Sequence, residues 1–383
     1  MLKEKIYRKF KEKFGSEPLL FKSPGRINLI GEHTDYNEGF VLPAAIDKYI
    51  YFAINRSEKN ICNLYSYDLN EFVTFPVFQQ QRSKKQWANY LTGVINEIYK
   101  RGKKLSGFDL VFGGNIPIGA GLSSSAALET GLAFALNKIF DLNFDPLELI
   151  KISQDAENNF VGVQCGIMDQ FIAVKGKKDH FLKLDCRTLE YEYFPFDTHE
   201  YQLLLCNSNV KHNLADSEYN KRIMECEKGV KLLSRDRKNI TKLRDVSLKE
   251  LDNHKSDFPV GTYEKCSYVI EENLRLHETC IELKKNNLRQ VGKLMYETHE
   301  GLKNKYNVSC NELDFLVDLT KQFDKIPGSR MMGGGFGGCT LNLIGKDFVK
   351  DFIKIVSREY KKKFNIEAEF YSMKIVDGTK ITC

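Results

Sequence analysis

A glycine- and serine-rich segment at residues 117–127 constrains the fold of this chain more than any other feature. It reads Pro-Ile-Gly-Ala-Gly-Leu-Ser-Ser-Ser-Ala-Ala and joins a predicted strand (residues 107–113) to an alanine- and leucine-rich helix predicted over residues 124–137. Glycines let the backbone turn several N–H groups toward one point, and the free N–H groups and dipole of a helix N-terminus attract phosphate. The segment indicates an anion-binding loop, although a serine cap after a flexible loop explains it equally well when it is taken alone.

Two common classes of phosphate-transfer protein are excluded by the motifs that the chain lacks. No Gly-Lys-Ser/Thr occurs, so the loop is not a Walker A loop, and neither His-Arg-Asp nor Asp-Phe-Gly of the protein kinases is present. Without a P-loop lysine, phosphate charge would be met by Mg²⁺ and other cations. Mg²⁺ prefers oxygen ligands and keeps waters, so the hydroxyl of Ser125 and one carboxylate would suffice. Glu157 is the candidate carboxylate, although on its own it reads more simply as a solvated helix residue.

A second polar cluster follows a strand predicted over residues 20–30. The strand carries Arg26, and the turn after it places Glu32, His33 and Asp35 within four residues. Sugar hydroxyls both donate and accept hydrogen bonds, so carboxylates and a histidine in one turn suit a polyol. A polar surface loop that closes at Gly39 is the alternative interpretation, and a metal site is less well supported because the turn has only one histidine.

A third segment, residues 165–171, places Asp169 in an otherwise apolar stretch. A partly buried aspartate can act as a general base if a cation such as Arg26 keeps it ionised, and a merely hydrogen-bonded aspartate is the alternative. A fourth stretch, residues 333–338, formally matches Gly-x-Gly-x-x-Gly. It precedes a predicted strand (residues 339–344), whereas a dinucleotide fingerprint follows a strand and opens a helix. It therefore predicts a flexible loop near a nucleotide or sugar.

Length and composition set the wider frame. A chain of 383 residues suits two domains, and we place the boundary near residue 190, giving residues 1–190 and 191–383. Strands and hairpins followed by helices predict an α+β fold. The net charge of +6 is a mild excess that gives little support to nucleic-acid binding, and no apolar run is long enough to span a membrane. Ten scattered cysteines without Cys-x-x-Cys indicate reduced thiols, so we expect a cytoplasmic protein, with a monomer favoured.

Taken together, these segments resemble the GHMP kinases, because the Gly25-Arg26 strand, the Gly-Leu-Ser-Ser-Ser-Ala loop and the late glycine-rich loop occur in the family's order. Within that superfamily the chain is similar to the galactokinase family. The motifs that carry this narrower resemblance are Gly-Glu-His-Thr-Asp-Tyr-Asn at residues 31–37, Cys-Gly-Ile-Met-Asp-Gln at 165–170, Asn-Ser-Asn-Val at 207–210, Ser-Glu-Tyr at 217–219 and Gly-Ser-Arg-Met at 328–331. The resemblance extends from about residue 17 to residue 380.

The resemblance implies a two-domain fold, with a ribosomal-S5-like N-terminal domain, a ferredoxin-like C-terminal domain and the active site between them. It implies transfer of the γ-phosphoryl group of ATP to the anomeric hydroxyl of α-D-galactose with Mg²⁺, the first step of the Leloir pathway. Asp169 would be the general base and Arg26 its partner. The implied sugar contacts are Glu32, His33, Thr34, Asp35, Gly166, Asp169 and Tyr219. The implied nucleotide contacts are Ser66, Gly119, Ala120, Gly121, Leu122, Ser123, Ser124 and Ser125, with Ser125 and Glu157 on Mg²⁺.

Two other functions stay open at this point. One is a kinase for N-acetylgalactosamine, which would need room beside the C2 hydroxyl, and the other is a galactose- and ATP-binding sensor without catalysis. A departure from the family pattern also matters, because Lys211 stands where arginine is half expected. Lysine keeps the positive charge there but cannot make the bidentate contacts of arginine.

Overall fold

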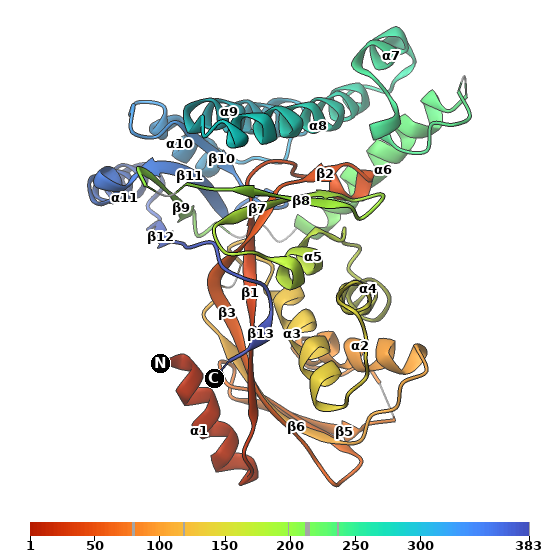
Figure 1. Cartoon of the computed structure of the whole chain (residues 1–383). Helices are drawn as coiled ribbons and strands as arrows, with labels where there is room; N and C mark the ends of the chain where they lie inside the picture. The colour runs from red at the N-terminus through yellow and green to blue at the C-terminus, as the bar shows by residue number, and fades with distance from the viewer. Residues whose placement is uncertain (79–80, 118, 198, 211–214, 236, 383) are drawn as a thin grey trace.

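The computed structural model describes residues 1–78, 81–117, 119–197, 199–210, 215–235 and 237–382. It combines three sheets with helices that pack on them, so the expected α+β class is confirmed. Figure 1 shows the largest sheet in the lower half of the molecule, and the long helices α8 and α9 in its upper part. The strands β1 and β3 run between these two regions.

The largest sheet is six-stranded, and its neighbouring strands are antiparallel except for the parallel pair of β4 and β6. In spatial order it contains β13 (Lys380–Ile381), β1 (Leu19–Asn28), β3 (Pro43–Arg56), β6 (Phe108–Gly114), β4 (Ile61–Ser66) and β5 (Glu71–Pro76). Successive side chains of a strand point to opposite faces. On β3, Phe52 and Ile54 therefore enter the main core while Ala53 packs with Ile6 and Phe10 of helix α1 (Leu2–Phe14).

Three helices cover the main-core face of this sheet, opposite α1 (Figure 1). They are α2 (Gln86–Lys100), α3 (Ser124–Ile139) and α4 (Pro146–Asp155). The start of α4 follows from its sequence, because Asp145 accepts hydrogen bonds from the backbone of Leu147 and Glu148 at 2.7 and 2.9 Å. The helix then continues into a π-helical turn, Ala156–Val161, which the capping residues did not predict.

The second half of the chain builds a four-stranded antiparallel sheet in the order β10 (Gly328–Met331), β11 (Cys339–Gly345), β9 (Tyr201–Asn207) and β12 (Glu369–Ser372). The helix α11 (Val349–Phe364) connects β11 to β12. These two strands flank β9 and run parallel to each other, so they form a β-α-β unit with another strand in its middle. The other helices of this half are α6 (Ala215–Leu233), α7 (Leu248–Asn253), α8 (Thr262–Lys284), α9 (Leu288–Asn304) and α10 (Asn311–Thr320).

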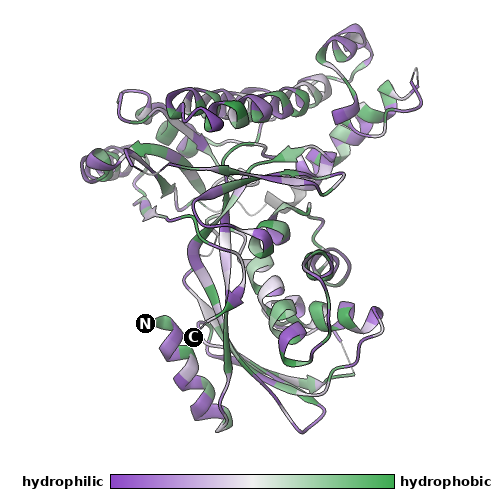
Figure 2. Cartoon of the chain, viewed as in Figure 1, coloured by the Kyte–Doolittle hydropathy of each residue, from purple (hydrophilic) through white to green (hydrophobic). Residues whose placement is uncertain are grey.

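A small third sheet and one short helix complete the surroundings of the site. The sheet contains β2 (Phe40–Val41), β7 (His180–Asp185) and β8 (Tyr191–Pro195), and the helix is α5 (Met168–Lys175). Figure 2 shows hydrophobic and hydrophilic residues on both α8 and α9, as expected for helices with one buried side. Within the described ranges, no helix is both long enough and apolar enough to cross a membrane.

Candidate active site

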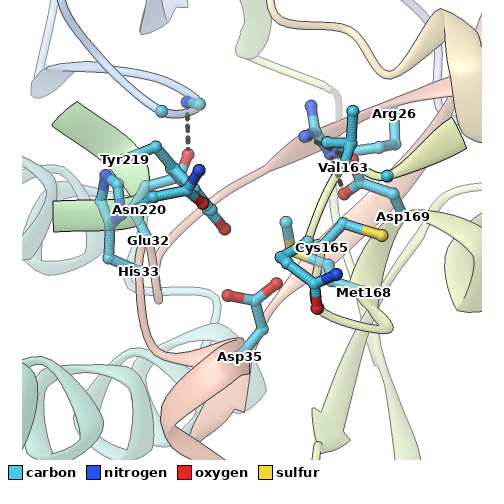
Figure 3. Close-up of a pocket in the computed structure, with 15 residues that line it drawn as sticks. Arg26, Glu32, His33, Asp35, Val163, Cys165, Met168, Asp169, Tyr219 and Asn220 are labelled. Carbon is cyan, nitrogen blue, oxygen red and sulfur yellow. Dashed lines mark hydrogen bonds and ion pairs between the residues drawn. The ribbon is translucent and has the colours of Figure 1, made fainter. Parts of the chain in front are cut away.

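A cavity of about 350 Å³ lies where β1, the turn after it, α5, α6 and the late glycine-rich loop meet. Figure 3 shows Arg26 and Asp169 on one side of this cavity and Glu32, His33 and Tyr219 on the other. The residues that line it are Arg26, Glu32, His33, Asp35, Gly162, Val163, Gln164, Cys165, Gly166, Met168, Asp169, Tyr219, Asn220, Gly333 and Gly334. The lining therefore brings together residues of the turn after β1, of the segment that carries Asp169 and of the late glycine-rich loop.

Arg26 and Asp169 form a bidentate ion pair at the cavity wall. Nε of Arg26 donates to Oδ1 of Asp169 at 2.8 Å, and Nη2 donates to Oδ2 at 3.0 Å. The hydroxyl of Ser123 also donates to Oδ2. Arg26 is buried, whereas the Asp169 side chain keeps 27% of its surface exposed. Burial opposes the charge of Arg26, but the carboxylates of Asp169 and Glu32 raise its pKa above the ordinary value. The Asp169 carboxylate is therefore partly exposed to the cavity, and hydrogen bonds from Arg26 and Ser123 fix its orientation.

Close backbone packing brings this pair together with the glycine- and serine-rich loop. The backbone N–H of Arg26 donates to the carbonyl of Leu122 at 3.2 Å, and its guanidinium donates to the carbonyl of Gly121. A Cβ atom on Gly25 would lie 2.8 Å from the Leu122 oxygen, a distance that side chains do not reach. Glycine at position 25 is therefore required for the loop to approach β1.

Glu32 is a buried carboxylate whose oxygens are already hydrogen-bonded. Oε1 accepts from Arg330 at 3.0 Å and from the backbone N–H of Gly333 at 2.8 Å, and Oε2 accepts from Asn28 at 3.0 Å. Burial opposes its ionisation, yet Arg330 and Arg26 lower the pKa of Glu32 below its ordinary value. Glu32 therefore lines the cavity and also connects the turn at residues 31–37 to the late glycine-rich loop.

His33 lies beside Glu32 in a nearly closed aromatic environment. It is 4% exposed, and the centroid of its ring lies 4.9 Å from that of Tyr306 and 5.5 Å from that of Tyr219. Nδ1 lies 2.9 Å from the hydroxyl of Tyr36. Burial lowers the pKa of His33 to about 4, against opposing effects of the Glu32 carboxylate and the Gly334 carbonyl. The imidazole is therefore neutral at physiological pH.

Asp35 is the third polar group of the same turn, and it begins a short 3-10 helix, Asp35–Asn37. Burial and the charge of Asp169 raise the pKa of Asp35 to about 7. The cavity thus contains one firmly ionised carboxylate beside Arg330, a second paired with Arg26, and a third that titrates near neutrality. Such a set of hydrogen-bond donors and acceptors can bind a neutral polyol in a fixed orientation.

The loop before α3 has the geometry expected of an anion-binding turn. Gly119, Gly121 and Ser123 have positive φ angles of 77°, 71° and 57°. The side chain of Ser123, which precedes α3, does not cap the helix, because its hydroxyl donates to Asp169 instead. The late glycine-rich loop lies against it, with a Cβ on Gly333 placed 3.7 Å from the Gly121 backbone. The two glycine-rich loops therefore lie side by side.

Two acidic side chains, Glu157 and Glu129, lie near the N-terminus of α3. Glu157 is buried in the π-helical turn and accepts from Gln170 at 2.7 Å. Burial raises the pKa of Glu157 above its ordinary value, against the opposing effect of the Ser125 hydroxyl. Glu129, one turn along α3 from Ser125, is fully buried, and neither carboxylate oxygen has a hydrogen-bond partner within the described residues. Burial and the charge of Glu157 raise the pKa of Glu129 well above its ordinary value. The two carboxylates form a region where a divalent cation would offset buried negative charge.

Two sequence-predicted residues, Thr34 and Ser66, lie apart from the groups described above. The structure places Thr34 outside the cavity lining: it is fully buried, and its hydroxyl donates to the carbonyls of Gly31 and Phe40 at 2.8 and 2.5 Å, which closes the turn. Ser66 is buried at the end of β4, where it pairs with Glu71 and Phe112 in the sheet. Lys211 lies outside the described residues.

Sequence reasoning missed other residues of the site. Val163, Gln164 and Asn220 line the cavity without a motif that singles them out. Arg330 is fully buried in β10 and donates to the Leu29 carbonyl at 2.8 Å as well as to Glu32. An arginine in a short strand is itself a signal, because a fully buried cation needs nearby acceptors.

Comparisons with known proteins agree with this geometry. The chain matches a family model described as a galactokinase galactose-binding signature at residues 8–56, and models of the GHMP kinase N-terminal and C-terminal domains at residues 89–177 and 281–362. It is 44% identical to a galactokinase of Thermosipho africanus over 363 residues, covering 94% of this chain and 99% of the relative. It is 42% identical to a galactokinase of Fusobacterium nucleatum over 382 residues, covering 98% of each.

Solved structures give the same result. A crystal structure of Lactococcus lactis galactokinase complexed with galactose superimposes with a TM-score of 0.96 at 34% identity, covering 100% of both chains. A mevalonate kinase of Methanococcus jannaschii superimposes with a TM-score of 0.67 at 18% identity, covering 95% of this chain and 100% of the other, which shows a shared fold.

Proposed function

Because the chain belongs to the galactokinase family of the GHMP kinases, we propose that it transfers the γ-phosphoryl group of ATP to the C1 hydroxyl of α-D-galactose. The product is galactose 1-phosphate, and the reaction opens the Leloir pathway. The observation that carries this proposal is the bidentate pair of Arg26 and Asp169 at a cavity that also presents His33 and Asp35. A base paired with a cation, next to side chains that can bind sugar hydroxyls, suits phosphorylation of a sugar.

In this mechanism Asp169 accepts the proton of the C1 hydroxyl while Arg26 keeps it ionised. Phosphoryl transfer passes through a loose transition state with its charge spread over the phosphoryl oxygens, so positioning and cations contribute more than base strength. Arg26 is placed to serve both needs, because its guanidinium binds Asp169 and the backbone of the glycine- and serine-rich loop. The Ser123 hydroxyl, which donates to Oδ2, fixes the carboxylate from a second direction.

The sugar would lie between the 31–37 turn and α5. His33, Asp35, Tyr219, Asp169 and the backbone at Gly166 would contact its hydroxyls, and Glu32 would add an acceptor while it anchors Gly333. Thr34 would support the turn from behind and not touch the sugar. These roles follow from the lining of the cavity and from the neutral state of His33.

The nucleotide would bind at the N-terminus of α3, with its phosphates on the backbone of residues 119–125. Ser66 is a further proposed contact that rests on the family pattern. Mg²⁺ would be held by the Ser125 hydroxyl and the Glu157 carboxylate, whose pKa this hydroxyl acts to lower. The oxygens of Glu129, which have no hydrogen-bond partner within the described residues, support this fit, because a dication nearby would stabilise the ionised form of a carboxyl group whose pKa is otherwise raised. When bound, Mg²⁺ would neutralise charge on the phosphates. Replacing Glu157 with Gln should raise the Mg²⁺ concentration needed for half-maximal rate, and an unchanged requirement would contradict this role.

The test of the proposed function is ADP release with Mg²⁺ and ATP against galactose, glucose, N-acetylgalactosamine, mevalonate and homoserine. We expect turnover with galactose that clearly exceeds turnover with the other four. Preferred turnover of N-acetylgalactosamine would keep the chemistry and change the sugar. Binding of galactose without turnover of any compound would favour a non-catalytic sensor and contradict the proposal.

A further inference from the structure

His33 has an unpaired nitrogen at the wall of the sugar cavity. Nε2 has no hydrogen-bond partner of good geometry within the described residues, although the residue is only 4% exposed. An imidazole nitrogen either donates or accepts, and which of the two it does decides how it can bind a sugar hydroxyl. The mechanism above leaves this property of His33 open.

The other nitrogen of His33 begins a chain of hydrogen bonds that leads away from the cavity. Nδ1 lies 2.9 Å from the Tyr36 hydroxyl, which lies 2.7 Å from the Tyr306 hydroxyl, which in turn lies 3.3 Å from the Cys226 sulfur. Tyr306 is fully buried directly after α9, and Cys226 is buried in α6. Parts of the chain far apart in sequence therefore meet behind one cavity residue.

Counting hydrogens ties the directions of these bonds to one another. A neutral imidazole carries one hydrogen and each hydroxyl has one, so the chain runs as a whole toward His33 or away from it. The carboxylates that share the cavity wall accept from sugar hydroxyls, so a donor at Nε2 complements them. In the direction that places the hydrogen on Nε2, Nδ1 accepts from Tyr36, Tyr36 accepts from Tyr306 and Tyr306 accepts from the Cys226 thiol.

We propose that Tyr306 is a positioning residue for the sugar, because its hydroxyl, acting through Tyr36, holds the hydrogen of His33 on Nε2 and so makes His33 a hydrogen-bond donor to a substrate hydroxyl. Tyr306 touches neither the sugar nor the reacting atoms. Its ring also packs against His33 and Tyr268, with centroids 4.9 and 4.8 Å apart, which limits rotation of the imidazole. This inference rests on the proposed function, since it needs a sugar in the cavity.

The first test removes only the hydroxyl. Tyr306→Phe keeps the ring contacts and should raise the KM for galactose about three- to tenfold, the value of one hydrogen bond. The kcat and the KM for ATP should stay within about twofold, because the chain ends at the sugar side of the site. Tyr296→Phe is the matched control, since this tyrosine lies on α9 and bonds Thr320 at 2.9 Å and the Ile326 carbonyl at 3.2 Å. It should leave all three constants unchanged.

The second test separates positioning from general loosening of the structure. In a His33→Ala background, Tyr306→Phe should add nothing to the loss of galactose affinity measured by calorimetry, because the residue through which it acts is gone. An equal loss in both backgrounds would overturn the proposal, as would an unchanged galactose KM in Tyr306→Phe. If Tyr306→Phe does not fold, Cys226→Ala removes the first donor instead, and an unchanged galactose KM there would overturn the proposal equally.

The donor assignment has its own probe. Deoxygalactoses identify the hydroxyl that His33 contacts, because its removal weakens binding to the wild type but not to His33→Ala. At that position fluorine can accept a hydrogen but not donate one, so the fluorinated sugar should keep part of the affinity that the deoxy sugar loses. Equal losses would show that His33 accepts, against the proposal. Turnover of galactose by the unmodified enzyme is measured in parallel, so failure of the proposed function is recognised separately.

Discussion

Gly166 lies so close to Asp35 that a Cβ atom at position 166 would sit 1.9 Å from Oδ2 of Asp35. Real Cβ atoms do not approach an oxygen this closely, so residue 166 must be glycine if Asp35 is to stay where it is. The contact joins the two sequence motifs on either side of the sugar cavity, because Asp35 belongs to the turn after β1 and Gly166 precedes α5. Glycine at 166 is therefore a requirement of the site as well as of the backbone.

Replacing Gly166 with Ala should displace Asp35 and weaken galactose binding. We expect the KM for galactose to rise at least about tenfold, since the methyl group forces the carboxylate out of its position. The double variant with Asp35→Gly is the control, because it removes all three Asp35 side-chain atoms that the methyl group would meet. The double variant should bind galactose no worse than Asp35→Gly alone, and a further loss would show that Gly166 acts through another contact.

Galactose affinity should depend on pH through Asp35, whose pKa is raised to about 7. Below that pH the group is protonated, and a neutral acid is a weaker acceptor for sugar hydroxyls than a carboxylate. We therefore expect the dissociation constant of galactose to increase as pH falls from 8 to 6, and to stay flat in Asp35→Asn. An equally steep dependence in Asp35→Asn would contradict this assignment.

The same pKa gives a stability prediction with a definite sign. The unfolded carboxyl loses its proton near pH 3.8, whereas the folded one keeps it to about pH 7, so the unfolded state binds fewer protons between these values. The free energy of unfolding should therefore fall as pH rises through this window, with a slope of at most about 1.4 kcal/mol per pH unit from this group. Comparing denaturant unfolding of the wild type with Asp35→Asn isolates the contribution of Asp35.

The charged segment at residues 234–260 contacts the sugar-binding turn on the side away from the cavity. Arg244 donates to the Glu38 carbonyl at 2.7 Å and makes a bidentate pair with Asp185 at 2.6 and 2.9 Å. Lys242 donates to the Tyr36 carbonyl at 3.2 Å. Both carbonyls belong to the turn that carries His33, so the segment supports the site.

Replacing Arg244 with Ala should loosen this turn without touching the chemistry. We expect a galactose KM about three- to tenfold higher with kcat and the KM for ATP nearly unchanged, and faster hydrogen exchange over residues 31–40. Lys249→Ala, which changes an exposed lysine of the same segment, is the matched control and should leave these values as they are. Normal exchange and a normal galactose KM in Arg244→Ala would contradict the supporting role.

Features with a local physical cause could be predicted from the sequence. The start of α4 follows from Asp145 and Glu148, and the pairing of Arg26 with Asp169 follows from the need of a partly buried carboxylate for a cation. The α3 N-terminus and the strand before it, β6, were also predicted, because glycine, serine and apolar periodicity act within a few residues.

Features that depend on distant parts of the chain could not be predicted. The two-residue strand β13 pairs with β1, and Thr379 bonds Ser23 at 2.8 Å, but so short a strand has no periodicity of its own. The helix α10 was missed, and α5 was described only as an apolar stretch. The link from Tyr306 through Tyr36 to His33 depends on two segments that are far apart in the sequence and meet behind the cavity, and no local pattern predicts it.

The central claim is that Asp169 is the base that Arg26 holds ionised, and the most direct measurement combines turnover with galactose binding in Asp169→Asn. Asparagine keeps the shape of the side chain but removes its charge and its ability to accept the hydroxyl proton. We predict that calorimetry shows galactose affinity within about threefold of the wild type while kcat falls ~10²–10⁴-fold, the usual contribution of a positioned base. A kcat within about tenfold of the wild type would contradict the claim.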